Sequence, residues 1–150
     1  MVIENPVGTF NAISGLWQST QDWAVELFDG SYFVVEAGAT SDGASIPRFL
    51  WSAVGPRFAP DTFGPALFHD LAYASHLLPR KDADAEFRRL LQYWGVSYSR
   101  ALAYYLAVRS FGWMRYNRVS RGEIEHSRQY CRIVKSVRIN FDGSSIEHCR

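Results

Sequence analysis

The stretch WAVELFDGSYFVVE, residues 23–36, decides the fold of the N-terminal part of this chain. Two apolar runs, Trp23–Phe28 and Tyr32–Glu36, flank a turn that contains Asp29-Gly30. An Asp-Gly pair between apolar runs is typical of a β-hairpin, because glycine accepts the positive φ that a tight turn requires. Two isolated strands are marginally stable, so this hairpin must pack on another part of the chain.

Helical patterns follow the hairpin. We expect four helices, which cover residues 47–54, 61–75, 81 or 82 to 94, and 97 or 99 to 114. Ser45 lies near the N-cap of the first helix, and Gly95 is placed to end the third, since helices commonly end at a glycine. Further on, residues 133–139 alternate apolar and polar side chains, which indicates a strand or an extended arm.

These patterns predict an α+β fold. A small N-terminal antiparallel sheet would pack on a three-helix core, with an extended C-terminal arm at the periphery. We expect a single domain over residues 1–150, because a chain of 150 residues suits one domain with a sizeable core. Within it, residues 1–40 are expected to be β-rich, 41–114 to form the helical core with the candidate site, and 115–150 to form a basic arm.

Composition and charge restrict the function classes. Hydrophobic residues make up 47% of the chain, which argues against disorder. A formal net charge of +1 argues against a dedicated nucleic-acid binder. The charge is uneven, however, because the first 47 residues hold six acids and no Lys or Arg, whereas the last 36 hold eight Lys or Arg and four acids.

Targeting signals and cysteines add little. The residues near Met1 include no Lys or Arg, so the basic segment that begins a signal peptide is lacking. No apolar run approaches the roughly 20 residues that are needed to cross a bilayer. We therefore expect a soluble protein without a transmembrane segment. The two cysteines, Cys131 and Cys149, are expected to be free thiols, with a bridge between them as the alternative.

The segment LFHDLAY, residues 67–73, holds the first candidate site residues. On a helix, His69 and Tyr73 stand one turn apart on the same face, whereas Asp70 points about 100° away. The short connection at residues 77–80 favours an antiparallel third helix, which would bring Asp84 back toward His69. A carboxylate there would orient the imidazole and stabilise its charged form.

The loop at Asp42-Gly43 supplies what a hard cation needs, namely a carboxylate and accessible backbone carbonyls. Calcium takes about six to eight oxygen ligands, which Asp42, Asp70, loop carbonyls and water can provide. Such an ion would polarise an ester carbonyl while His69 activates water. Asp42-Gly43 can equally be a simple turn.

Two resemblances rest on these motifs. The run from Thr40 to Gly112, TSDGASIPRFLW followed by GPALFHDLAY, RKDADAEF and GVSYSRALAYYLAVRSFG, resembles an uncharacterised domain family of bacteriophages and prophages. The order of Asp42-Gly43, His69-Asp70-x-x-Tyr73 and Asp84-x-x-Phe87 also resembles prokaryotic and parvoviral phospholipase A2.

The phospholipase resemblance implies roles for individual residues. His69 would be the general base, Asp84 its supporting carboxylate, and Asp42, Gly43 and Asp70 the calcium site. Asp84 is preferred over Asp82 because it stands three residues before Phe87. The resemblance also implies three tyrosines as hydrogen-bond donors around the supporting carboxylate, Tyr73, Tyr104 and Tyr105.

Each of these residues has a purely structural interpretation as well. His69 can be a core histidine bonded to a carbonyl. Asp84 can be an acid in the first turn of its helix, where the helix dipole stabilises a negative charge, and can pair with Arg88.

Two hypotheses therefore remain. The first is a calcium-dependent hydrolase that acts on ester bonds of host envelope lipids. The second is a non-catalytic component of a phage particle, in the tail or its tip, which binds neighbouring subunits or copies of itself. Both place the chain in the host cytoplasm during synthesis and in the virion afterwards, and neither includes a specific nucleic-acid partner.

Overall fold

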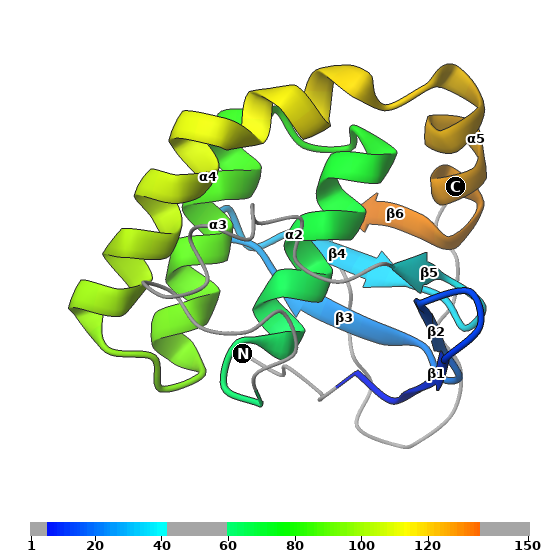
Figure 1. Ribbon diagram of the computed structural model, residues 1–150, viewed down its shortest axis with the longest axis horizontal. Coiled ribbons are helices and arrows are strands. Elements are labelled where there is room, and N and C mark those ends of the chain that lie inside the picture. Colours follow the sequence, from blue (N-terminus) through cyan, green and yellow to red (C-terminus); the bar gives the residue numbers. More distant parts are fainter. Residues whose placement is uncertain (1–5, 42–59, 136–150) are drawn as a thin grey trace.

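The computed structural model describes residues 6–41 and 60–135 (Figure 1). The expected helix over 47–54 and the loop at Asp42-Gly43 lie outside the described residues. The described elements are, in chain order, β1 (Gly8–Asn11), β2 (Leu16–Ser19), β3 (Trp23–Glu26), β4 (Tyr32–Val35), β5 (Thr40–Ser41), α2 (Phe63–Ser75), α3 (Arg80–Tyr93), α4 (Tyr98–Arg118), α5 (Arg121–Tyr130) and β6 (Cys131–Val134).

The expected α+β fold is confirmed, with two small antiparallel sheets rather than one. The first sheet has the order β1-β2-β5 and the second the order β3-β4-β6. The hairpin predicted around Asp29-Gly30 is confirmed as β3 and β4, which pair from Trp23 opposite Val35 to Glu26 opposite Tyr32. Gly30 adopts a φ of 78°, the left-handed conformation that its turn requires.

Three helices form the expected core beside the sheets. Helix α2 packs against α3, and α3 packs against α4. The predicted stop at Gly95 is confirmed, since this residue has a φ of 88° just after α3 ends. Helix α4 is longer than expected and continues to Arg118.

Helix α2 is central because it is buried along almost its whole length. One side contacts the β3-β4-β6 sheet, where Phe68 meets Phe33 edge-on with ring centroids 5.2 Å apart. Ala66 on α2 joins a second apolar cluster with residues of α3 and α4. Figure 1 shows α2 between the sheet and the α3–α4 pair, so groups on α2 can be reached from both.

The C-terminal part differs from the expected arm. Residues 121–130 form α5, which packs against α2, and β6 pairs with β4 from Val35 opposite Cys131 to Tyr32 opposite Val134. Arg128 of α5 donates from Nε to the carbonyl of Ser75 at 2.8 Å, and thereby caps the C-terminus of α2. Through residue 134 the chain is therefore part of the fold.

Two absences hold for the described residues only. Within residues 6–41 and 60–135, no helix combines the length and the apolar character needed to cross a membrane. The buried thiol of Cys131 is free, and burial raises its pKa to about 12.

The role of α5 can be tested with Arg128→Ala. We expect the free energy of unfolding to fall by about 1 kcal/mol, because two carbonyls at the end of α2 lose a charged donor. Arg121→Ala is the matched control, since Arg121 is exposed and its side chain makes no hydrogen bond to the described residues. Urea unfolding measures both variants, and equal stability of the two would contradict a structural role for this contact.

Candidate functional site

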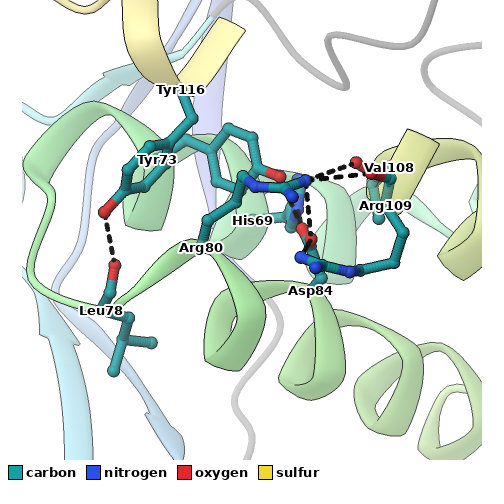
Figure 2. A network of polar contacts seen from close by, with 8 residues as sticks. All are labelled: His69, Tyr73, Leu78, Arg80, Asp84, Val108, Arg109 and Tyr116. Carbon is teal, nitrogen blue, oxygen red and sulfur yellow. Dashed lines mark hydrogen bonds and ion pairs between the residues drawn. The ribbon is translucent and has the colours of Figure 1, made fainter. Parts of the chain in front are cut away.

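The side chains of His69, Tyr73 and Asp84 meet between α2 and α3 (Figure 2). The imidazole Nε2 of His69 lies 2.8 Å from Oδ1 of Asp84. The hydroxyl of Tyr73 donates to the same oxygen at 2.6 Å. His69 and Tyr73 therefore lie on one face of α2, as predicted. Helix α3 returns along α2 and brings Asp84 to both of them, as also predicted.

Two arginines that the sequence analysis did not name lie at the other oxygen of Asp84. Arg109 of α4 donates from Nη1 to Oδ2 at 2.8 Å. The Nη1 of Arg80 lies 3.6 Å from the same oxygen. Arg80 stands one turn before Asp84, so this i,i+4 pair was readable from the sequence. The expected pairing with Arg88 is wrong, because the guanidinium of Arg88 lies instead over the rings of Tyr98 and Tyr105.

This environment keeps Asp84 ionised although its side chain is fully buried. Burial alone would raise the pKa of its carboxyl group. Hydrogen bonds from His69, Tyr73 and Arg109 outweigh that effect and hold the pKa below its usual value. Burial, together with the hydrogen bond to Asp84, raises the pKa of the Tyr73 hydroxyl, so Tyr73 remains a neutral donor.

The environment of His69 favours the neutral imidazole. Burial lowers its pKa, and the opposing effect of Asp84 does not overcome burial. An ionised carboxylate only accepts hydrogen bonds, so Nε2 must carry the proton that it shares with Asp84. The other ring nitrogen, Nδ1, then has a lone pair, and no side chain or backbone group among the described residues bonds to it.

Packing fixes the positions of the two rings. The His69 ring lies against those of Tyr73 and Phe87, with centroid distances of 4.2 Å and 4.7 Å. Gly112 of α4 leaves room for Tyr73, because a Cβ at Gly112 would stand 2.4 Å from the Tyr73 hydroxyl oxygen. The sequence analysis did not identify the role of Gly112, because a glycine is required there only when α4 lies as close to α2 as it does in this fold.

Asp70 lies in a different environment from His69, as expected for a side chain that points about 100° away from it around α2. Its Oδ2 accepts a hydrogen bond of 2.6 Å from the hydroxyl of Ser41 in β5. Its charge also contributes to the raised pKa of Cys131. The other expected metal ligands, Asp42 and Gly43, lie outside the described residues. Within residues 6–41 and 60–135, no group of three or more His, Cys, Asp or Glu side chains is placed to hold a metal ion.

The remaining expected residues lie elsewhere. Tyr104 is buried against Phe87, with ring centroids 5.9 Å apart, and Tyr105 lies beside Arg88. Neither donates to Asp84, so that expectation is wrong for both. Asp82 is exposed in the first turn of α3, so of the two candidate aspartates it is Asp84 that meets His69.

The lowered pKa of His69 predicts how stability depends on pH. The unfolded chain takes up a proton near the ordinary value of 6.5, while the folded chain resists doing so. The free energy of unfolding should therefore fall as the pH is lowered through about 6.5, and more steeply near 3.8, where unfolded Asp84 is protonated.

His69→Gln should flatten the part of this dependence that begins near pH 6.5. His126→Gln, at an exposed position, is the matched control. Chemical denaturation across the pH range measures both variants, and NMR titration gives the His69 pKa directly. A His69 pKa at or above 6.5 would contradict the buried, neutral state.

The comparisons with known proteins identify one family. No curated protein and no solved structure matches the chain. Residues 17–108 match the family described as "Protein of unknown function (DUF1353)". This region includes the hairpin, α2, α3 and all of the residues that meet at Asp84 except Arg109. The chain therefore belongs to the DUF1353 family.

Proposed function

We propose that this protein hydrolyses carboxylic ester bonds of lipids, with His69 as the general base and Asp84 as the carboxylate that orients it. The observation that carries the proposal is the pair itself. Nε2 of a neutral imidazole is held at 2.8 Å by a buried carboxylate, while Nδ1 keeps its lone pair. A base must be neutral before it accepts a proton, and the lowered pKa of His69 meets that condition.

The chemistry follows from this tautomer. Nδ1 of His69 accepts a proton from a water molecule as the water oxygen attacks the ester carbonyl carbon. Asp84 stabilises the imidazolium that forms, because Nε2–H donates to its carboxylate. Nδ1 then returns the proton to the leaving alcohol oxygen as the ester C–O bond breaks. The products are a carboxylic acid and an alcohol, and Tyr73 and Arg109 keep Asp84 in position throughout.

The lipid substrate and the calcium ion are proposed from the resemblance to phospholipase A2. The described residues supply one carboxylate and one hydroxyl for an ion, from Asp70 and Ser41. Asp42 directly follows Ser41 in the chain, and the Ser41 hydroxyl donates to Asp70. These residues would hold calcium, which when bound would polarise the ester carbonyl.

The test is release of fatty acid from phospholipid vesicles and from short-chain esters, with and without calcium. Wild type should hydrolyse these esters, and His69→Gln should reduce kcat by at least about a hundredfold. His126→Gln is the matched control and should retain the wild-type rate. Urea unfolding of each variant separates lost catalysis from lost folding. Equal rates in wild type and His69→Gln, or no hydrolysis by wild type in any condition, would refute the proposal.

A second candidate function is a non-catalytic component of a phage particle, in its tail or tail tip. One observation favours a structural role. Asp84 joins side chains from α2, α3 and α4 in a buried network, an arrangement that also serves to fix helix packing. The phage context is proposed from the resemblance of the motifs between Thr40 and Gly112.

Mass spectrometry of purified particles, from host cells that express the chain during phage production, tests this second function. A structural component should be present in a fixed ratio to the other particle proteins. The same ratio should be found for the His69→Gln chain, because assembly would not depend on catalysis. Absence of the chain from washed particles would overturn the structural role.

A further inference from the structure

The Asp84 network carries more positive than negative charge. Arg80 and Arg109 each contribute a full positive charge, and Asp84 contributes the single negative charge. His69 and Tyr73 are neutral, because burial lowers the pKa of the first and raises the pKa of the second. Neither arginine pairs with a second carboxylate among the described residues. Counted over residues 6–41 and 60–135, one unit of positive charge is therefore left without a carboxylate partner beside a buried group.

The two guanidinium groups lie close together and in fixed positions. Their Nη1 atoms are 2.8 Å and 3.6 Å from the same oxygen of Asp84, so they cannot be farther apart than those two distances combined. Nη1 of Arg80 also donates to the carbonyls of Val108 and Arg109, at 3.4 Å and 3.1 Å. Figure 2 shows Arg80 and Arg109 approaching Asp84 from different sides.

Donors remain on both groups. The hydrogen bonds to Asp84 and to the α4 carbonyls all come from Nη1, which leaves Nε and Nη2 of each arginine for another acceptor. The side chains of Arg80 and Arg109 are 23% and 31% exposed. Among the described residues, the side-chain nitrogens that are buried without a partner belong to Trp23 and Arg88. Nε and Nη2 of Arg80 and Arg109 are not among these atoms, and both side chains are partly exposed to solvent.

We propose that Arg80 and Arg109 form a binding site for a phosphate-type oxyanion next to His69. A tetrahedral oxyanion presents oxygens in several directions, so it can accept hydrogen bonds from two guanidinium groups that arrive from different helices. A planar carboxylate suits a single guanidinium fork, whereas Arg80 and Arg109 each present their own nitrogens. The bound anion would balance the surplus charge. This site does not depend on ester hydrolysis, because it requires only the two arginines.

The phosphate group can come from a free phosphate ion or from a lipid headgroup. Calorimetric titrations at constant ionic strength distinguish these sources with two probes, inorganic phosphate and a short-chain phosphatidylglycerol below its micellar concentration. Saturable binding of the lipid that is tighter than that of inorganic phosphate assigns the headgroup, and the reverse order assigns the free ion. Absence of saturable binding for both probes would overturn the proposal.

The variants Arg80→Gln and Arg109→Gln locate the site. Each should weaken binding by about tenfold, as expected for the loss of charge-assisted hydrogen bonds. Arg118→Gln is the matched control, because Arg118 is exposed on the same helix as Arg109 and its side chain makes no hydrogen bond to the described residues. Binding equally weakened in Arg118→Gln, or unchanged in both site variants, would overturn the proposal.

A second measurement guards against a change in folding. Arg80 lies farther from Asp84 than Arg109 does, so Arg80→Gln should retain the His69–Asp84 pair. The NMR titration of His69 reports this pair. In wild type the probe that binds should shift the His69 pKa upward, because a nearby anion favours the imidazolium, and in Arg80→Gln this shift should shrink. A His69 pKa that does not respond to the probe in wild type would count against binding at this site.

Discussion

The buried carboxylate of Asp84 is the group on which the arrangement of the helices depends. Its two oxygens accept hydrogen bonds from α2, through His69 and Tyr73, and from α4, through Arg109. A fully buried aspartate without these donors would carry the desolvation cost of an isolated charge. The helices must therefore approach in the one arrangement that brings the donors to it, and Gly112 permits that approach by leaving space for Tyr73.

Much of the fold was predictable because its determinants are local. The hairpin follows from two apolar runs around Asp29-Gly30, and the end of α3 follows from Gly95. Helix α5 was missed because its sequence, RGEIEHSRQY, holds few apolar residues, namely Ile124 and Tyr130. A local signal was nevertheless present in Ser120-x-x-Glu123, since the Ser120 hydroxyl accepts from the Glu123 backbone N–H at 3.1 Å.

The candidate site was predictable to the extent that it depends on helix periodicity. One turn separates His69 from Tyr73, and a short connection returns α3 along α2, which together bring Asp84 to both side chains. Arg109 was not predictable in this way. Its contact spans 25 residues and requires the packing angle between α3 and α4, which side chains of both helices determine together. Local patterns in one sequence do not determine the angle at which two helices pack.

Arg80 and Arg109 also limit what Asp84 can do for His69. A carboxylate raises the basicity of an imidazole by stabilising the imidazolium, and here the same carboxylate also balances two guanidinium groups. Burial lowers the His69 pKa more than Asp84 raises it, which favours the neutral imidazole. An anion bound to the two arginines would offset their charge and restore basicity to Nδ1. A substrate that carries a phosphate close to its ester would therefore activate the base that attacks it, whereas a neutral ester would meet a weaker one.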